Sequence, residues 1–351
     1  MSSLQINYCP GTLAAGHSTY SRTCLNRMFN GRKVSHILPY ESPVSSETDR
    51  VLFAENLKRV SISGVQEKFS VLLEKNKLRL VNEGEVGRYI LKPIPRMVKN
   101  GAQMPANEHL TMQIARQVFS IETAENALIF FKNNEPAYIT KRFDFRDEEG
   151  GQSGGQSSAK WTSPRWASPR WASPRWAKED FASLAGRTPA THGEHYKYLG
   201  SYLELFELMK KFLPAYKLEA PKLLKLLVFN YLFSNGDAHF KNFSLVETSF
   251  GDYRLSPAYD LLNTRMHIED SDFALDDGLL PGSMRKGKVT DQFRILAHEA
   301  GIAEKQIGHI LEDMLSSEEK VKALIGASFL DDRFKRNYLQ AYQTRLKKMM
   351  R

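Results

Sequence analysis

A short polar segment that follows an apolar stretch holds the residues best suited to chemistry. In the sequence Asn235-Gly236-Asp237-Ala238-His239-Phe240-Lys241-Asn242, an aspartate and an asparagine stand five positions apart. The Asp237 carboxylate can accept a hydroxyl proton, and the Asn242 amide oxygen can bind Mg2+. Asp260 lies 18 residues beyond Asn242 and would supply a second oxygen ligand. These residue types predict metal-assisted transfer of a phosphoryl group to a hydroxyl.

The same spacing occurs in the catalytic loop of protein kinases, where the aspartate is the base and the asparagine binds magnesium. Such a site also needs a lysine against the nucleotide phosphates, and Lys92 ends a strand-like run. Glu108 opens the next predicted helix and would orient that lysine. From spacing alone, simpler alternatives stay open: a turn that caps a helix, an ordinary strand-end lysine and an acid that favours the helix dipole.

The elements that must position these residues divide into a β-rich first half and a helical second half. Short apolar runs before residue 141 alternate with turns, which is typical of strands. The predicted strands are residues 69–73, 78–81, 89–91, 127–131 and 137–140. A helix capped by Asn107 is predicted to interrupt them, because Leu110, Ile114, Ala115 and Val118 have helical spacing.

The second half is predicted to be largely helical. Apolar residues from Tyr198 to Phe212 form a helix face, residues 223–233 form a buried helix, and helical patterns return from Val289. A β pair, residues 243–246 and 253–255, lies between them. We therefore expect an α+β, two-lobed fold. Its N-lobe would be residues 1–143, its helical C-lobe residues 179–351, and residues 144–178 would form an insert between them.

The insert has an unusual composition. Residues 150–158, GGQSGGQSS, are typical of a flexible linker, and the sequence Ser-Pro-Arg-Trp-Ala then occurs three times at residues 163–177. A proline every five residues excludes a helix interior. We expect a mobile or extended loop. The alternative is that its arginines and tryptophans dock on an anionic or aromatic partner.

Composition excludes several classes of protein. The 351 residues are 42% hydrophobic and 25% charged, unlike a mainly disordered, collagen-like or coiled-coil chain. No apolar run approaches the roughly 20 residues of a membrane-spanning helix, and the first residues lack the pattern of a secretory signal. The net charge of +9 favours anionic partners. Cys9, Cys24 and His17 do not make a convincing zinc site, and two cysteines suit a reducing cytoplasm.

Taken together, these blocks resemble the HipA family of serine/threonine kinases, which are toxins of bacterial toxin–antitoxin pairs. The matching segments are residues 61–68 (SISGVQEK), 90–93 (ILKP), 107–109 (NEH), 140–144 (TKRFD), 179–181 (EDF), 235–242 (NGDAHFKN) and 257–261 (PAYDL). They follow the family order. Because the phosphate loop begins near residue 61, the chain is most similar to the short HipT type, which lacks most of the N-terminal subdomain of longer HipA toxins.

The resemblance implies a protein-kinase-like (HipA-like) fold and a role for each matched residue. Asp237 would be the catalytic base, Asn242 and Asp260 would hold Mg2+, and Lys92, with Glu108 as its partner, would contact the nucleotide phosphates. The remaining residues expected around ATP are Ser63, Gly64, Val65, Gln66, Glu67 and Lys68 in the phosphate loop, Lys141 and Phe143 at the hinge, and His239, Lys241 and Tyr259.

The resemblance also implies self-regulation. Family members autophosphorylate a serine just before the loop glycine, which ejects the loop and silences the kinase. Ser61 falls at that position, and Ser63 is a second candidate. A phosphate of about −2 charge cannot stay where the ATP phosphates must bind.

The implied activity is ATP- and Mg2+-dependent phosphorylation of a serine in an aminoacyl-tRNA synthetase, which blocks translation. The implied partners are that substrate and cognate antitoxin proteins, which commonly bind DNA. We expect no direct DNA binding by this chain and no membrane association. The expected location is the cytoplasm, and delivery into another cell stays open. Two alternatives are kept: a kinase-like protein with a host or small-molecule substrate, and a non-catalytic binding protein.

Overall fold

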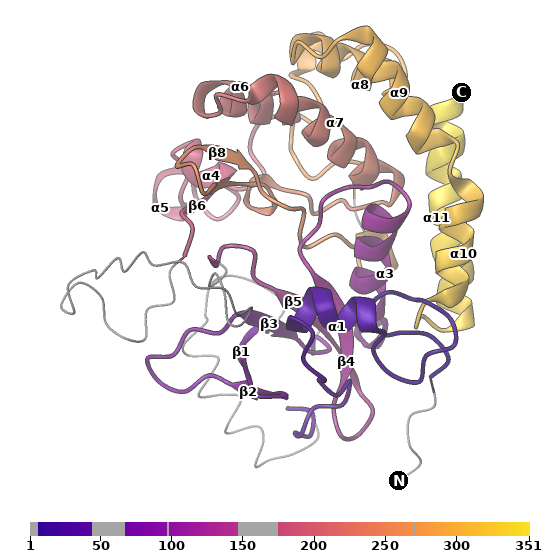
Figure 1. Cartoon of the computed structure of the whole chain (residues 1–351). Helices are drawn as coiled ribbons and strands as arrows, with labels where there is room; N and C mark the ends of the chain where they lie inside the picture. Colours follow the sequence, from indigo (N-terminus) through magenta and orange to yellow (C-terminus); the bar gives the residue numbers. More distant parts are fainter. Residues whose placement is uncertain (1–5, 44–66, 97, 147–174, 270) are drawn as a thin grey trace, which may run out of the picture.

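The computed structural model describes residues 6–43, 67–96, 98–146, 175–269 and 271–351. They form a lobe built on a sheet and a larger helical lobe (Figure 1). The α+β, two-lobed architecture predicted from the sequence is thus confirmed.

The first lobe is built on an antiparallel sheet whose five described strands lie in the order β2-β1-β3-β5-β4. The strands are β1 (Phe69–Glu74), β2 (Lys77–Leu80), β3 (Tyr89–Lys92), β4 (Asn126–Phe130) and β5 (Pro136–Lys141). Each matches a predicted strand to within one residue at either end. In this register Lys92, the last residue of the central strand β3, lies opposite Tyr138 of β5.

A helix covers each face of this sheet. On one face, α1 (Arg22–Phe29) contributes Met28 and Phe29 to a cluster with Ile129. On the other face, α3 (Met104–Gln117) follows the 3-10 turn η1 (Gly101–Gln103) and packs with Leu128. Helix α1 was not predicted, because residues 1–58 are largely polar, with scattered Gly, Pro and Ser, and suggest no regular element. Its Ser21 cap nevertheless accepts a hydrogen bond from the Cys24 amide.

The predicted cap of α3 was wrong. The helix begins at Met104, with Pro105 in its first turn, and Asn107 lies inside it and fully buried. The Asn107 side chain instead donates to the Asn263 carbonyl at 2.8 Å and accepts from the Asn263 amide at 3.0 Å. Asn107 therefore joins α3 to the loop that follows Asp260, which is a tertiary role that helical propensity does not reveal.

The second lobe is mainly helical. Its helices are α4 (Phe181–Leu184), α5 (Pro189–His192), α6 (Tyr202–Phe212), α7 (Tyr216–Leu232), α8 (Val289–Glu299), α9 (Glu304–Leu315), α10 (Glu318–Ala327) and α11 (Asp332–Met350). Short 3-10 turns are η2 (Phe240–Asn242), η3 (Thr264–Met266) and η4 (Gly282–Met284). A small sheet has the order β6 (Lys178–Asp180), β7 (Ser244–Glu247) and β8 (Tyr253–Leu255). None of the described helices is long and apolar enough to cross a membrane.

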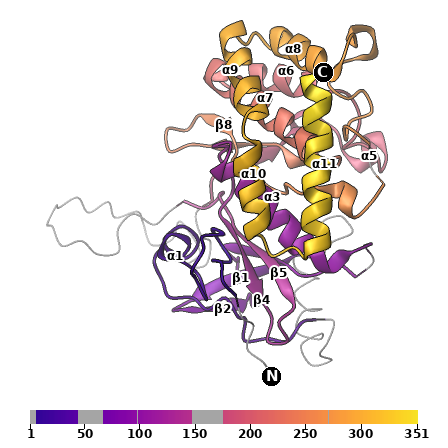
Figure 2. The ribbon, with the colours of Figure 1, turned by 90° about the vertical axis from the view of Figure 1, so that its right-hand side faces the viewer.

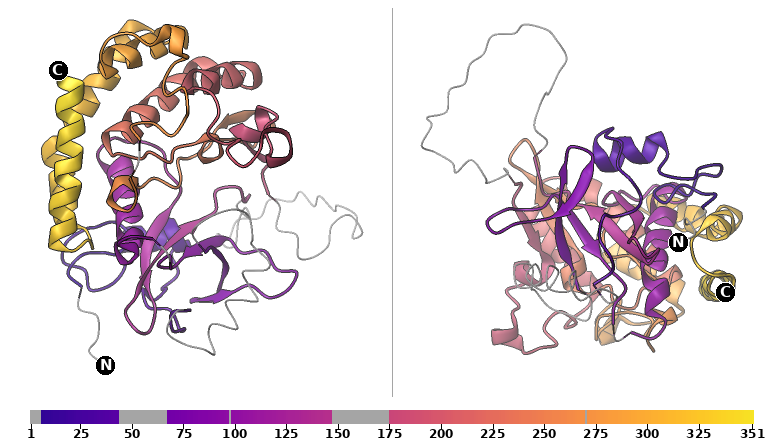
Figure 3. Two further views of the ribbon diagram at one scale, coloured as in Figure 1. Left: turned by 180° about the vertical axis from the view of Figure 1, so that it is seen from behind. Right: turned by 90° about the horizontal axis from the view of Figure 1, so that it is seen from below.

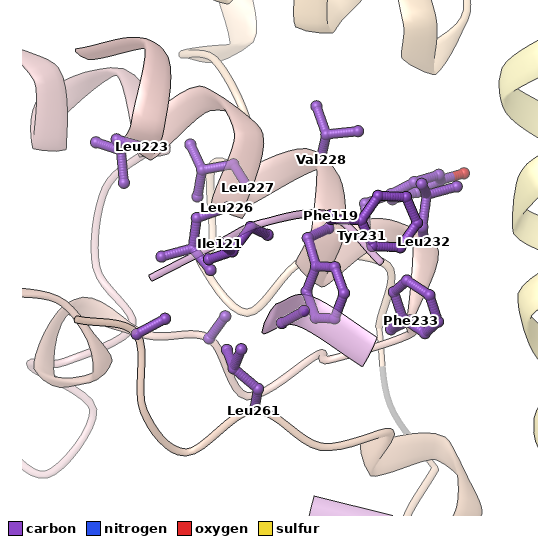
Figure 4. Packing of buried hydrophobic residues seen from close by; sticks show 14 of the residues in the cluster. Phe119, Ile121, Leu223, Leu226, Leu227, Val228, Tyr231, Leu232, Phe233 and Leu261 are labelled. Carbon is purple, nitrogen blue, oxygen red and sulfur yellow. The ribbon is translucent and has the colours of Figure 1, made fainter. Parts of the chain in front are cut away.

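Helix α7 is the centre of this lobe. Its residues Leu223, Leu227 and Phe233 just beyond it are buried and pack with Phe119 and Leu261 (Figure 4). Phe229 and Phe233 stack at 4.4 Å between ring centroids. Burying each such side chain contributes about 2 kcal/mol. The segment that follows α7, which holds Asp237 and Asn242, therefore starts from a rigid helix end.

Helices α10 and α11 connect the two lobes. They run along one side of the molecule from the helical lobe towards the sheet (Figures 2 and 3). Helix α10 packs against α3, and the Tyr338 hydroxyl of α11 lies 2.7 Å from the Thr111 hydroxyl of α3. Glu108, on the same helix α3, is thereby held at a fixed place relative to the helical lobe.

The described end of the third repeat packs on its own chain. The Trp176 amide donates to the Asp144 carbonyl at 2.8 Å, and the Arg146 guanidinium lies 4.3 Å from the centre of the Trp176 ring. Arg175 lies over the Phe145 ring at 5.0 Å. Residues 147–174, including the first two repeats, lie outside the described residues.

Buried His109 predicts a loss of stability in acid. Burial lowers the pKa of His109 to about 4, against about 6.5 in an unfolded chain. The unfolded state thus binds more protons between these values, and stability falls as pH drops through them. We expect this residue alone to cost about 2 kcal/mol of unfolding free energy between pH 7 and pH 5. In urea denaturation, His109→Gln should not show this loss of unfolding free energy between pH 7 and pH 5. His309→Gln, at an exposed position, should show the same loss as the wild type.

Candidate active site

Two adjoining cavities open between the lobes. The larger has a volume of about 470 Å³, the smaller about 200 Å³, and both are lined by Lys68, Lys92, Lys178, Tyr259 and Asp260. The larger one adds Glu108, Tyr198, Asp237, His239, Lys241 and Asn242. The predicted base, the two predicted metal ligands and the predicted phosphate lysine therefore share one cleft.

Lys92 forms ion pairs with two acidic residues of this cleft. Its Nζ lies 2.6 Å from Glu108 Oε1 and 2.5 Å from Asp260 Oδ1. The side chains of Lys92 and Glu108 are only 4% and 3% exposed, so water screens this ion pair little. The three groups come from β3, α3 and the loop after β8, and their contact links both lobes at one point.

The charges of these ion pairs stabilise one another. Burial opposes a charged ammonium, but Asp260 and Glu108 outweigh it and raise the pKa of Lys92 above its usual value. Burial also opposes a charged Asp260, yet Lys68 and Lys92 hold the pKa of this carboxyl well below its usual range. Burial raises the pKa of Glu108, and the attraction of Lys92 offsets only part of that effect. Lys92 and Asp260 are thus charged at neutral pH.

The backbone at Asp260 adopts an unusual conformation that aims its carboxylate into the cleft. Its φ of 55° lies in the left-handed region, which costs a non-glycine residue about 1 kcal/mol. Lys68 Nζ lies 3.4 Å from Asp260 Oδ2 on the side opposite the strand lysine. Strain in a site residue is expected where function needs a particular direction of the side chain.

Asp237 is placed by the end of α7 and by the loop beyond Asp260. Ser234, in the left-handed region at φ 52°, turns the chain out of the helix. Its carbonyl accepts hydrogen bonds from the Thr264 amide at 3.1 Å and hydroxyl at 3.0 Å. The Thr264 hydroxyl in turn accepts from the Gly236 amide at 2.9 Å. The segment that holds the predicted base and the predicted metal loop are therefore joined by hydrogen bonds.

The turn after Asp237 carries the other predicted residues. The Asn242 amide donates to the His239 carbonyl at 2.8 Å, which closes η2. The Tyr259 hydroxyl donates to the Lys241 carbonyl at 2.9 Å. Burial lowers the pKa of His239 to about 3, so its ring is neutral at pH 7. Tyr259 thus anchors the turn, and it lines the cleft together with His239, Lys241 and Asn242.

The residues present fit a magnesium ion that arrives with a nucleotide. Asn242 Oδ1 is buried and has no hydrogen-bond partner among the described residues, and the Asp260 carboxylate faces the same cavity. No group of three or more His, Cys, Asp or Glu side chains suited to a metal occurs in the described part of the chain. Two oxygen ligands completed by phosphate oxygens is the usual arrangement for Mg2+ in kinases.

The smaller cavity extends the cleft towards the sheet. Lys141 and Phe143, the predicted hinge residues, line it together with apolar Ile90 and Ala124. The Phe143 and Tyr259 rings lie 5.7 Å apart, and Lys178 Nζ lies within 5.7 Å of both ring centres. A flat aromatic base fits such an apolar, aromatic wall. Lys178 was not predicted as a site residue, because it directly follows the repeats and belongs to no recognised motif.

The predicted phosphate loop is only partly described. Ser61, Ser63, Gly64, Val65 and Gln66 lie outside the described residues. Of the remaining loop residues, Lys68 contacts Asp260, as above, and Glu67 Oε1 lies 3.4 Å from Arg96 Nε.

Tyr198 is a site residue that was wrongly predicted to lie on a helix face. Helix α6 begins later, at Tyr202, and Tyr198 lies in the loop before it. Its hydroxyl donates to Asp237 Oδ1 at 2.8 Å, and its ring lies edge-on to His239 at 5.2 Å. A tyrosine within an apolar stripe carries no sequence signal for this contact.

Replacing Tyr198 by phenylalanine tests that contact. Burial raises the pKa of Asp237, and the Tyr198 hydrogen bond partly counteracts this rise. Tyr198→Phe should therefore move the acidic limb of the rate profile to higher pH, and activity at neutral pH should fall by about three- to ten-fold. The measurement is kcat/KM against pH. An unchanged limb would mean that Tyr198 only packs.

With this geometry in view, comparison with known proteins decides the family. The sequence model of the HipA-like C-terminal domain matches residues 60–321, about three quarters of the chain. The chain belongs to this HipA-like family. The match covers all five strands of the first sheet and most of the helical lobe. It therefore includes every cleft residue named above.

Individual relatives agree with this assignment. The chain is 28% identical over 298 residues to a Sinorhizobium fredii protein named "Putative kinase Y4dM", across 81% of this chain and 63% of that protein. It is 22% identical to a Haemophilus influenzae protein named "Putative kinase", across 87% of this chain and 86% of that protein. The chain thus spans less than two thirds of the length of Y4dM.

A solved structure shares the fold. The HipA chain in a Shewanella oneidensis complex of HipA, HipB and operator DNA superimposes with a TM-score of 0.59 at 20% identity. The match covers 83% of this chain and 64% of that HipA chain.

Proposed function

We propose that this HipA-like protein is an ATP- and Mg2+-dependent serine/threonine protein kinase. One observation carries the proposal: a base, an unpartnered amide oxygen, a carboxylate and a buried Lys–Glu pair meet in a single cleft. These are Asp237, Asn242, Asp260, Lys92 and Glu108. Kinases need these groups together because phosphoryl transfer depends on positioning and charge stabilisation.

In this proposal each group has a separate task. The adenine would lie in the smaller cavity beside Phe143 and Tyr259, and the phosphates would extend past Lys92 and Lys68. Mg2+ held by Asn242 and Asp260 would neutralise phosphate charge. Asp237 would accept the proton of the acceptor hydroxyl at Oδ2, while the Tyr198 hydroxyl keeps its hydrogen bond to Oδ1.

The proposed biological role is that of a toxin in a bacterial toxin–antitoxin system. Membership of the HipA-like family supports it, and the Shewanella HipA structure contains HipB and operator DNA. On the same grounds, we propose that the substrate is a serine of an aminoacyl-tRNA synthetase and that the partner is a cognate antitoxin. The kinase would silence itself by phosphorylating Ser61 or Ser63. The work of the toxin would then take place in the cytoplasm.

Transfer of label from γ-32P-ATP tests the class of acceptor. The purified protein is incubated with labelled Mg-ATP and a bacterial extract divided into protein and small-molecule fractions. We expect label in protein, on phosphoserine, with a purified aminoacyl-tRNA synthetase as one acceptor. Label confined to small molecules would contradict a protein kinase. Label transfer by Asp237→Asn at the wild-type rate would contradict the role of Asp237 as the base.

A further inference from the structure

The loop that joins α5 to α6, residues 193–201, contributes to the larger cavity of the cleft (Figure 1). Two of its residues, Lys197 and Tyr198, line this cavity together with Asp237. The Tyr198 hydroxyl already has a partner there, because it donates to Asp237. Lys197 has no task in the mechanism proposed above and belongs to no motif found in the sequence.

Hydrogen bonds hold the backbone of this loop beside the turn that follows Asp237. The Phe240 amide donates to the Lys197 carbonyl at 3.1 Å. The Asp276 amide donates to the Tyr198 carbonyl at 2.9 Å. The backbone at Lys197 is therefore fixed both to the turn that carries Asn242 and to the helical lobe.

The Lys197 side chain extends over a ring that contacts Asp237. Its ammonium lies 4.9 Å from the centre of the Tyr198 ring, whose hydroxyl donates to Asp237 Oδ1 at 2.8 Å. The face of an aromatic ring attracts a cation and so favours this position of a flexible side chain. Burial raises the pKa of Asp237, and the Tyr198 hydrogen bond and the positive charge of Lys197 both counteract this rise. The ammonium is thus near enough to act on the charge of Asp237.

The other lysines of the larger cavity contact other groups. Lys68 and Lys92 both pair with Asp260, on the side of the predicted metal ligands. Lys241 Nζ lies 4.0 Å from a carboxylate oxygen of β6. Lys178 lies over the two aromatic rings of the smaller cavity. None of these contacts places a lysine on the side of Asp237 that faces the α5–α6 loop.

Lys197 has no acidic partner in the part of the chain that the structure describes. No carboxylate of these residues lies within 4.0 Å of its ammonium. The side chain is half-exposed and faces the cavity next to Asp237. A cation without a carboxylate partner, held at the wall of a nucleotide-sized cavity, is available to an anionic group of a ligand.

The chemistry of phosphoryl transfer brings an anionic group to this place. In the proposed function, the acceptor oxygen gives its proton to Asp237 and forms a bond to the γ-phosphorus of ATP. At the same time the bond between that phosphorus and the bridging oxygen of ADP breaks. The γ-phosphate must therefore lie one acceptor oxygen away from Asp237. Its outer oxygens carry negative charge throughout the transfer, so a cation placed there lowers the barrier.

We propose that Lys197 is a catalytic residue that contacts the γ-phosphate of ATP. This inference rests on the proposed kinase function and deepens it. Lys68 and Lys92 approach the phosphates from the first lobe, whereas Lys197 approaches from the helical lobe. ADP lacks the γ-phosphate, so the contact predicts that Lys197 distinguishes ATP from ADP in binding as well as in catalysis.

Calorimetry with Mg-AMP-PNP and with Mg-ADP tests this contact without requiring turnover. The Kd of each nucleotide is measured for the wild type, Lys197→Met and Lys197→Arg. We expect Lys197→Met to weaken AMP-PNP binding by about ten-fold, because one charge-assisted contact is lost, and ADP binding by less than about two-fold. Lys197→Arg keeps the charge and should recover most of the AMP-PNP affinity. The kcat of Lys197→Met for transfer from ATP should fall by about a hundred-fold.

The matched control is Lys211→Met on α6. The Lys211 ammonium also lies over the ring of the next residue, 5.2 Å from the centre of Phe212, but it is exposed and lines neither cavity of the cleft. Both nucleotides should bind to this variant as to the wild type. The unfolding midpoint of Lys197→Met should also equal that of the wild type, because a half-exposed side chain without an ion pair is removed.

The two Kd values separate the possible outcomes. AMP-PNP binding that is equal in Lys197→Met and the wild type would overturn the γ-phosphate contact. An equal loss for AMP-PNP and ADP would overturn it as well and would place Lys197 on the part that both nucleotides share. Unchanged AMP-PNP affinity with a raised KM for a protein acceptor would assign Lys197 to the acceptor instead. Wild-type protein that binds neither nucleotide would contradict the proposed function itself, a result that differs from each of these.

Discussion

Asp237→Asn should lower kcat by about a thousand-fold while nucleotide binding stays intact. The asparagine keeps the shape of the side chain but cannot accept the proton of the acceptor hydroxyl. The fold should tolerate the change, because the Asp237 side chain is 45% exposed and burial already disfavours its charge. The unfolding midpoint should therefore be equal to that of the wild type or higher.

Two measurements check this prediction together. Calorimetry follows the binding of an ATP analogue with Mg2+, and labelled ATP follows transfer. The control is Asp276→Asn, an exposed acid whose backbone amide donates to the Tyr198 carbonyl but whose side chain does not line the cleft. Near wild-type kcat in Asp237→Asn would show that another group is the base.

Lys92→Met should lower kcat/KM by about a hundred-fold and also destabilise the protein. The buried lysine neutralises two carboxylates, so its removal leaves Glu108 without a cation and Asp260 with Lys68 alone. Breaking such a buried pair costs about 3–5 kcal/mol of unfolding free energy. Exposed Lys77→Met on β2 should leave both quantities unchanged.

A double-mutant cycle separates these two effects. Glu108→Gln removes the carboxylate left without a cation, so the Lys92→Met, Glu108→Gln double variant should recover part of the lost stability. Catalysis should not recover, because the buried cation proposed to contact the phosphates is still missing. Recovery of full activity in the double variant would contradict a phosphate-binding role for Lys92.

Local pattern predicted much of the fold. The five strands of the first sheet were found from short apolar runs, such as residues 69–73, that alternate with turn segments along the chain. Helix α7 was predicted only over residues 223–233, where the sequence is apolar on nearly all sides, and its start at Tyr216 was missed. Helix α1 was missed because its eight residues include Arg22, Asn26 and Arg27, and only Cys24, Met28 and Phe29 are buried.

The contacts that build the cleft could not be derived from local pattern. Lys92 and Asp260 are 168 residues apart, and Lys68 and Asp260 are 192 apart. Spacing alone left Lys92, Glu108 and Asp237 with simpler alternatives, and the resemblance to HipA grouped them. Asn107 and Tyr198 were misjudged because their side chains make tertiary hydrogen bonds that a local helical pattern does not reveal.

Mass spectrometry of the purified protein after incubation with Mg-ATP tests the proposed kinase activity most directly. We expect added phosphate on Ser61 or Ser63 in the wild type and none in Asp237→Ala. That result would show phosphoryl transfer by this cleft in an assay that needs no separate substrate. Wild-type protein that gains no phosphate and binds no ATP would contradict an active kinase.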